Sequence, residues 1–347
     1  MAFSFQPACR PMLLGSLPHR SAAQAMIHIR KTTHELLAWP QLPQRSFREA
    51  NLTQAALGLP GLVIEASHGL VFVEPERALA EMDRLDLAYL RHDLSYAALA
   101  PEDISGLSEM QRQPESVRDA YALKGQMMGP ISLAAQLTDD QARPLIYETL
   151  FFEAIIHHLH LRAAWHVSQL VELNGATIMC LDEPCLEAMS HSFLPISWEQ
   201  ARAAIEEVFS SIDGYHALYA GGQIDWARIL HWSIDMVIAD TFTYHDALVN
   251  AGAALAEFFD RGGHIGLGMI PTDAELLQHA TAEQLAHRIE LLLESFASYG
   301  IPKQRFLNHS ILTTQDSLGH LNVEMAEYAM QLLADTSNLI RQQYDLN

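Results

Sequence analysis

From residue 120 to the end of the chain, short apolar runs alternate with longer amphipathic segments. The short runs predict strands, and the longer segments, in which apolar residues recur every three or four positions, predict helices. A helix between successive strands implies parallel pairing with crossover connections. Strands are predicted at 121–124, 176–181, 214–219, 235–239, 264–268 and 306–312, and helices at 143–173, 197–209, 225–231, 245–259, 281–299 and 323–344.

The number of strands decides between a closed barrel and an open sheet. An early strand at Met12–Gly15 and a weak one near Leu94–Ala97 bring the count to about eight, which predicts a (β/α)8 TIM barrel. The alternative is an open doubly wound sheet, but no glycine-rich dinucleotide fingerprint follows the first strand. No linker divides residues 1–347, so one domain is expected. Leu62–Val73, with Gly69 near its centre, predicts a hairpin insertion, and Pro101–Pro114 predicts an exposed loop.

Composition narrows the class of protein. Hydrophobic residues make up 49% of the chain and charged residues 18%, so a sizeable core is expected and disorder is not. The net charge of −21 disfavours nucleic acid as a partner, because Lys and Arg supply most of that affinity. No apolar run approaches the ~20 residues that span a membrane. Met1–Gly15 shows no leader pattern, and the three cysteines show no disulfide framework, so a cytoplasmic protein is expected.

Polar residues follow two of the predicted strands, where a barrel places its active site. Gly15 and Ser16 follow the first strand, and the amides that begin the next helix suit a carboxylate. The same residues also suit an ordinary strand–helix turn. Lys124 and Gln126 lie in the segment 124–130, which fits equally well a surface lysine and a Gly-Pro turn. Each signal is weak alone.

Two adjacent carboxylates, Asp182 and Glu183, end the buried strand 176–181, directly before Pro184. Such groups are costly to desolvate unless they bind a cation or hydrogen-bond donors. A substrate ammonium group suits Asp182. The alternative is that Asp182 caps the following helix, since aspartate is a common N-cap and proline commonly opens the first turn.

Several motifs occur in a fixed order along nearly the whole chain. They are GSLPH (15–19), WPQLP (39–43), REANLTQAALGLPG (48–61), KGQMMGP (124–130), LDEP (181–184), GLGMIPT (266–272) and a Gly-His-Leu turn at 319–321. Taken together, these motifs resemble the superfamily of cobalamin-independent methionine synthase and uroporphyrinogen decarboxylase. The closer resemblance is to the catalytic C-terminal barrel of the synthase and to its short stand-alone relatives.

The resemblance implies methyl transfer to the thiol of a small amino-acid substrate. In the family, the serine of the GS motif and the aspartate of the DEP motif hold that substrate, and here they are Ser16 and Asp182. Glu49 matches a glutamate of the early loop. Glu183 and Gln126, in the matching motifs, are assigned to the same substrate site.

The resemblance also implies a zinc ion bound by His, Cys, Glu and Cys, which presents the substrate thiol as thiolate. Here the histidine is His216, the first cysteine becomes Leu218, Asp240 matches the glutamate, and Asp316 (or Ser317) takes the place of the last cysteine. Such a set is harder than one with two thiolates. Zinc held more weakly, a harder metal such as iron(II) or manganese, and no metal at all remain open, because both aspartates also suit helix caps.

The leading hypothesis is therefore a homocysteine methyltransferase-like enzyme with an altered metal site, in which His216 and Asp182 are the catalytic residues. A folate donor is in doubt because the synthase's additional N-terminal barrel has no counterpart here, so a methyl-corrinoid protein is a candidate partner. A second hypothesis is a different enzyme that uses a hard metal at His216, Asp240 and Asp316. A third is a non-catalytic binding or accessory protein that has lost the zinc.

Overall fold

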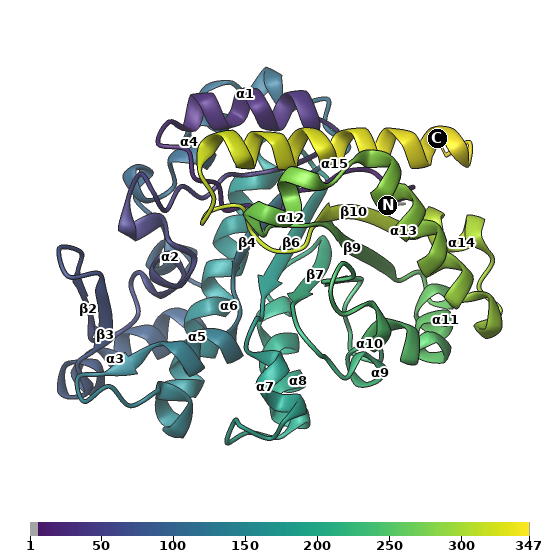
Figure 1. Cartoon of the computed structure of the whole chain (residues 1–347). Coiled ribbons are helices and arrows are strands. Elements are labelled where there is room, and N and C mark those ends of the chain that lie inside the picture. The colour runs from purple at the N-terminus through teal and green to yellow at the C-terminus, as the bar shows by residue number, and fades with distance from the viewer. Residues whose placement is uncertain (1–5, 347) are drawn as a thin grey trace.

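A single parallel sheet of seven strands organises the computed structural model, which describes residues 6–346 (Figure 1). The strand order is β1-β4-β6-β7-β8-β9-β10, and every pairing is parallel. The strands are β1 (Leu36–Ala38), β4 (Ala122–Met128), β6 (Thr177–Asp182), β7 (Tyr215–Ala220), β8 (Met236–Ala239), β9 (His264–Ile270) and β10 (Ser310–Thr314).

Residues 11 and 12 close this sheet into a barrel. Pro11 pairs in parallel with Leu312 on β10, and Met12 pairs in parallel with Leu36 on β1, so one short segment joins the two edge strands. The amide of Met12 donates to the carbonyl of Leu312 at 2.9 Å. The predicted (β/α)8 barrel is confirmed, with the first predicted strand reduced to these isolated bridges.

Helices surround the sheet, and α1 lies side by side with α15 (Figure 1). None of the helices within residues 6–346 is long and apolar enough to cross a membrane. The helices are α1 (Ala22–Thr32), α2 (Asn51–Ala56), α3 (Pro75–Leu90), α4 (Ser105–Arg112), α5 (Pro130–Gln136), α6 (Thr149–Val171), α7 (Leu186–Ser190), α8 (Trp198–Phe209), α9 (Trp226–Ile229), α10 (His245–Asn250), α11 (Gly252–Asp260), α12 (Ala274–His279), α13 (Ala282–Ser295), α14 (Lys303–Asn308) and α15 (Val323–Gln343).

Three predicted elements are wrong. Leu94–Ala97 forms a 3-10 helix. The barrel strand that precedes β4 is instead β1, at Leu36–Ala38, which is too short to show a periodic pattern. The predicted strand 306–312 begins only at Ser310, because its first residues complete α14. The segment 101–114 is not an exposed loop, since α4 within it packs on α1.

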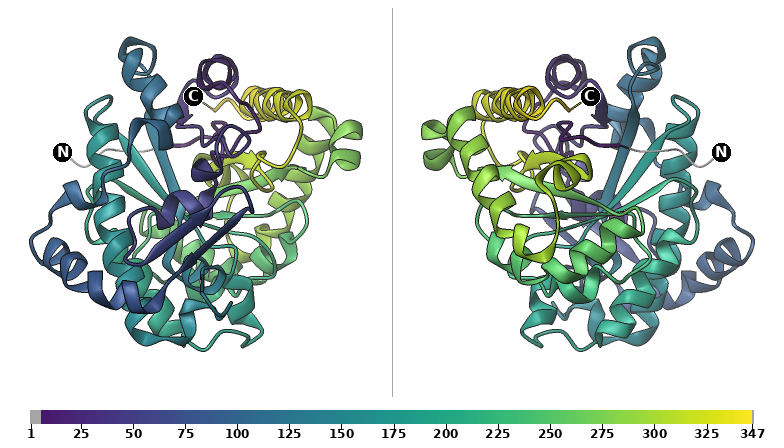
Figure 2. Two further views of the ribbon diagram at one scale, coloured as in Figure 1. Left: turned by 90° about the vertical axis from the view of Figure 1, so that its left-hand side faces the viewer. Right: turned by 90° about the vertical axis from the view of Figure 1, so that its right-hand side faces the viewer.

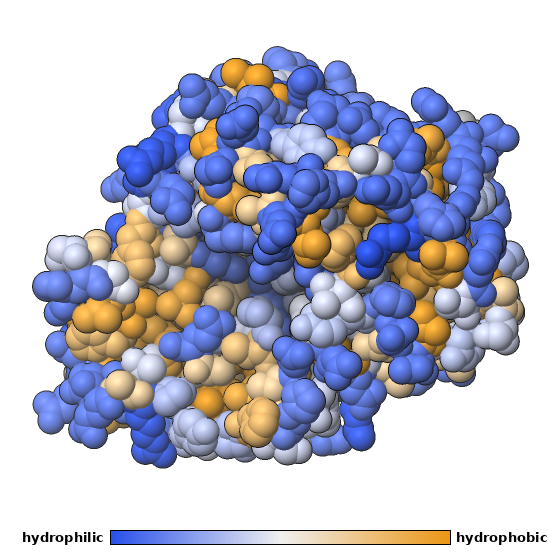
Figure 3. Space-filling model, in the orientation of Figure 1, coloured by the Kyte–Doolittle hydropathy of each residue, from blue (hydrophilic) through white to orange (hydrophobic). Residues whose placement is uncertain are grey.

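The predicted hairpin insertion is confirmed. β2 (Leu62–Glu65) and β3 (Leu70–Val73) pair antiparallel, and β3 also pairs with β5 (Thr138–Asp139). The hairpin lies outside the barrel sheet and in front of it in Figure 2, left. Apolar side chains gather on this side of the surface in Figure 3. Leu70 of β3 and Leu79 and Leu90 of α3 are among the exposed large apolar residues of the described chain.

Candidate active site at the carboxyl end of the barrel

The barrel interior is apolar along most of its length and becomes polar at its carboxyl end. Alternate residues of each strand point inward. The inward apolar cluster includes Leu36, Ala122, Ile178, Cys180, Ala217, Met236, Ile238 and Ile311. The next inward positions, at the ends of β6 and β8, carry Asp182 and Asp240, and Tyr219 occupies the last inward position of β7. Polar groups at this end match the usual position of an active site in such barrels.

Asp182 ends β6 and is 9% exposed. The side-chain amide of Asn51, at the start of α2, donates to its Oδ2 at 2.9 Å. Burial raises the pKa of Asp182 to about 6, against the opposing influence of the Lys124 ammonium and the Asn51 hydrogen bond. Asp182 is therefore a buried carboxylate that titrates close to neutrality, which is common for groups that bind or exchange protons with a substrate.

A hydrogen-bond network joins Tyr219, Asp240 and the segment that follows β10. The Tyr219 hydroxyl lies 3.1 Å from the carbonyl of Gln315 and 3.3 Å from Oδ1 of Asp316. The Gln315 side chain donates to Oδ2 of Asp240 at 3.1 Å, and the amide of Thr243 donates to Oδ1 of Asp240 at 2.9 Å. Asp316 thus contacts the Tyr219 phenol directly, and Gln315 connects the same phenol with Asp240.

Burial is the main cause of the perturbed pKa values here. It raises the pKa of Asp240, and it raises the pKa of Tyr219 well above its ordinary value, with the charges of Asp316, Asp182 and Asp240 adding to the effect. The Tyr219 phenol therefore stays protonated near neutral pH and acts as a hydrogen-bond donor. Asp182 and Tyr219 are register partners on β6 and β7, Asp240 directly follows β8, and Asp316 bonds to the Tyr219 hydroxyl; these four residues are called the acidic cluster below.

Lys124 and Gln126 lie below the acidic cluster, inside the barrel, and both are fully buried. The Lys124 ammonium donates to the carbonyl of Leu14 at 2.7 Å and to Oε1 of Gln126 at 3.1 Å, while the Gln126 side chain donates to the carbonyl of Trp39 at 2.9 Å. Lys124 is therefore no surface residue. Its single charge offsets only part of the negative charge above it.

Gly15 and Ser16 bring the first predicted motif to the same end of the barrel. Gly15 has a φ of +126°, and a Cβ there would lie 2.3 Å from the Gln126 side chain, so both conformation and space require glycine. The Ser16 hydroxyl lies 3.4 Å from Oε1 of Gln41. Ser16 therefore contacts the buried side chain of Gln41, and its role in substrate binding stays a prediction.

Glu183 and Glu49 are fully buried and have hydrogen-bond partners within the chain. Glu183 accepts from the amides of Ile131 at 2.9 Å and Ser132 at 2.7 Å, so it caps the first turn of α5, although burial raises its pKa to about 7. Glu49 accepts from the amide of Leu42 at 3.1 Å, from the Ser105 hydroxyl and from Arg45. These contacts show how both glutamates support the loops around the site.

His216 does not join Asp240 and Asp316. It is the second residue of β7, and Tyr215, Ala217 and Tyr219 take the inward positions of that strand, so His216 points outward. Its ring stacks on Phe209 of α8, with 4.7 Å between ring centroids. The expected three-residue set at one position is therefore corrected: the two aspartates lie at the carboxyl end, and the histidine lies near the amino end and outside the barrel.

A zinc site of the expected type does not fit these residues. Across residues 6–346, no group of three or more His, Cys, Asp or Glu side chains is arranged to hold a metal ion. The cysteine that contacts the cluster, Cys180, is fully buried, its thiol lies 3.6 Å from Oδ1 of Asp182, and burial raises its pKa far above the ordinary value. Zinc favours thiolate and imidazole ligands, and the cluster offers neither.

Sequence reasoning missed Asn51, Tyr219 and Gln315. Asn51 and Tyr219 lie inside segments that carry the family resemblance, at 48–61 and 216–219. Neither residue type by itself indicates a role in an active site. Gln315 directly follows β10 and directly precedes Asp316, and this position after a strand is the one sequence feature that could have marked it as a site residue. Their roles depend on long-range contacts that no local pattern encodes.

Comparison with known proteins supports the fold. No family model matches the chain, and no curated protein matches it either. A solved structure assigned as a vitamin B12-independent methionine synthase from Listeria monocytogenes has a TM-score of 0.56 and 13% identity, over 92% of this chain and 86% of that one. A methyltransferase from Methanosarcina mazei has a TM-score of 0.53 and 13% identity, over 93% and 86%. At this identity, the likeness shows that the chain shares their barrel fold.

Proposed function

We propose that this chain is a methyltransferase-like enzyme that binds the ammonium group of a small amino-acid thiol at the carboxyl end of the barrel. The observation that carries this proposal is a polar layer at the carboxyl ends of β6, β7 and β8. Asp182 and Tyr219 are register partners there, Asp240 directly follows β8, and Asp316 lies 3.3 Å from the Tyr219 hydroxyl. A buried carboxylate cluster favours a cationic ligand, because the ligand's charge offsets the cost of burying the carboxylates. The names of the two solved structures with the same fold support methyl transfer as the reaction class.

Within this proposal, Asp182 is the ion partner of the substrate ammonium, and Ser16 contacts its carboxylate or amine. Asn51 positions Asp182 by donating to one oxygen, which leaves the other oxygen for the substrate apart from a long contact of 3.6 Å with the Cys180 thiol. Tyr219 is a hydrogen-bond donor to the ligand. The methyl donor is a small molecule or a methyl-corrinoid carrier protein.

In the family, a zinc ion held by two cysteine thiolates activates the substrate thiol. In this chain, the substrate thiol must ionise without such a zinc ion. A free thiol has a pKa of about 8.5. If no metal activates the thiol, the rate of methyl transfer should rise about tenfold per pH unit up to about 8.5, as the thiolate fraction grows. A metal-activated thiol would instead give a flat profile down to neutral pH.

Calorimetric titration tests the binding step. L-homocysteine should bind, and 4-mercaptobutanoate, which lacks only the ammonium group, should bind at least tenfold more weakly. Equal affinity for the two compounds would contradict an ammonium site. Methionine formation from L-homocysteine, with methylcobalamin and 5-methyltetrahydrofolate supplied in parallel, then tests the reaction class and the donor.

A second candidate function is favoured by the missing metal set: a protein that binds a small amine and catalyses nothing. It predicts the same preference for L-homocysteine over 4-mercaptobutanoate. It differs in giving no methionine with either donor, at any pH between 6 and 9 and with or without added zinc, iron or manganese.

A further inference from the structure

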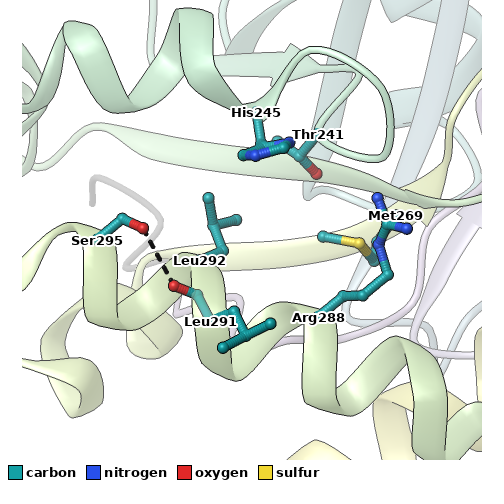
Figure 4. A pocket seen from close by; sticks show the side chains of 7 residues that line it. All are labelled: Thr241, His245, Met269, Arg288, Leu291, Leu292 and Ser295. Atoms are coloured by element: carbon teal, nitrogen blue, oxygen red, sulfur yellow. Dashed lines mark hydrogen bonds between the residues drawn. The ribbon is translucent and has the colours of Figure 1, made fainter.

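A separate cavity of about 240 Å³ lies outside the barrel wall, between the loop after β8, the strand β9 and the helix α13 (Figure 4). It is lined by Thr241, His245, Met269, Arg288, Leu291 and Leu292. Met269 belongs to the GLGMIPT motif at 266–272, which the proposed function leaves without a role.

The Thr241 hydroxyl in this cavity lacks a hydrogen-bond partner among the described residues, although Thr241 is only 1% exposed. In Figure 4 the hydroxyl points into the space between Leu292 and Met269. The Ser295 hydroxyl nearby differs, because it donates to the carbonyl of Leu291 at 3.1 Å. Leaving a buried hydroxyl unpaired is unfavourable, and a polar ligand atom in the cavity would pair with it.

Arg288 supplies a positive charge to the same cavity. Its guanidinium donates to the carbonyl of Phe242 at 2.7 Å and lies over the Phe242 ring, with its Cζ 4.2 Å from the ring centroid. The Arg288 side chain is exposed at the mouth of the cavity, and no carboxylate within residues 6–346 forms a salt bridge with it, although acidic residues outnumber basic ones by 42 to 21. A guanidinium has five N–H donors, and its planar fork matches a carboxylate.

The remaining walls are apolar. Met269 and Leu292 are almost fully buried, and Leu291 covers another side. The volume is below the roughly 300 Å³ at which pockets for larger ligands begin. From these walls, the unpaired hydroxyl and the unpaired cation, we infer that this cavity binds a small monocarboxylate with a short apolar chain, whose carboxylate contacts Arg288 and Thr241.

This site is separate from the acidic cluster. Asp240 and Thr241 are neighbours in the chain, but Asp240 continues the inward series of β8 and its carboxylate bonds to Gln315, whereas Thr241 lines the outer cavity. The two sites also favour ligands of opposite charge. Binding at one can therefore be measured, and can fail, independently of the other.

The test follows the methyl resonance of Met269 in protein labelled with [methyl-13C]methionine, assigned with the variant Met269→Leu. Hexanoate should shift this resonance in a saturable way, with a Kd on the order of 1 mM or tighter. Hexanamide, which has the same size and no charge, should bind at least tenfold more weakly. Arg288→Gln should weaken hexanoate binding by about tenfold or more, and Arg91→Gln, at the exposed C-cap residue of α3, should leave it unchanged.

The variant Thr241→Val tests whether the Thr241 hydroxyl binds a ligand or only contributes to packing. Because it replaces an unpaired buried hydroxyl by a methyl group, it should raise the Tm of the ligand-free protein and yet weaken hexanoate binding about threefold to tenfold. The inference is overturned if hexanoate leaves the Met269 resonance unmoved, if hexanamide binds equally well, or if Arg288→Gln and Arg91→Gln bind hexanoate alike.

Discussion

The two ends of the barrel interior are built by the same strands and yet differ in chemistry. Near the amino end and through the middle, the inward positions of β6, β7 and β8 carry Ile178, Ala217 and Met236. Two to four residues further along the same strands, the inward positions carry Asp182, Tyr219 and Asp240. The difference shows that the last inward layer is free to carry polar groups, since the layers beneath it already supply the packing that closes the barrel.

The largest effect should separate the two ends by ligand affinity. Asp182→Asn should weaken L-homocysteine binding by about 2–5 kcal/mol, because it leaves the ligand ammonium without its buried ion partner. His216→Ala, near the other end, should change the affinity less than about twofold. Calorimetry on both variants measures this contrast, and equal losses would mean that the site is wrongly placed.

The pH dependence of binding should sharpen the same contrast. Burial raises the pKa of Asp182 to about 6, and only its ionised form attracts an ammonium group. The affinity for L-homocysteine should therefore be constant above about pH 7 and fall about tenfold per pH unit below 6. Asp182→Asn should abolish this dependence, whereas a profile unchanged in the variant would assign the titration to another group.

Glu183 tests whether adjacent carboxylates have different roles. Its oxygens accept from the amides of Ile131 and Ser132 at the start of α5. Glu183→Ala leaves these buried amides unpaired and should lower the free energy of unfolding by about 2 kcal/mol. Urea unfolding at pH 5, below the raised pKa of Glu183 of about 7, measures the loss of the cap with little contribution from a buried charge, and an unchanged midpoint would show that water replaces the cap at no cost.

The raised pKa of Asp182 gives Asp182→Asn the opposite effect on stability at pH 7. A carboxyl whose folded pKa is raised binds its proton more tightly in the folded state, so stability is lost as pH rises from about 4 through 6. At pH 7 the substitution should therefore stabilise the fold by about 1–3 kcal/mol, and below pH 4 it should change nothing. Urea unfolding at both pH values distinguishes this effect from a general packing change, which would persist at low pH.

The smallest effect concerns the apolar part of the interior. Ile178→Val removes one methylene group from a fully buried position and should lower the free energy of unfolding by about 0.5–1.5 kcal/mol. Ligand affinity should stay the same, because the change lies two inward positions below Asp182. A loss of affinity comparable with that of Asp182→Asn would show that the two ends are mechanically coupled.

The sequence by itself determined the barrel. Alternating apolar runs and amphipathic segments predicted the order of strands and helices from residue 120 onward, and the adjacent carboxylates after 176–181 marked the end of a strand. These features are local, because hydrophobic periodicity records which face of each element is buried. The capping box of α8, formed by Ser197 and Gln200, is local in the same way, because all of its contacts lie within one turn.

Only the tertiary structure decided which side chains meet. The side-chain direction in a strand reverses at every residue, so the exact phase of β7 placed Tyr219 inside the barrel and His216 outside it. Likewise, Asp182 faces the interior while its neighbour Glu183 turns to α5, a helix some fifty residues earlier in the chain. Such pairings depend on register and on contacts between distant segments, and no local pattern in the sequence specifies them.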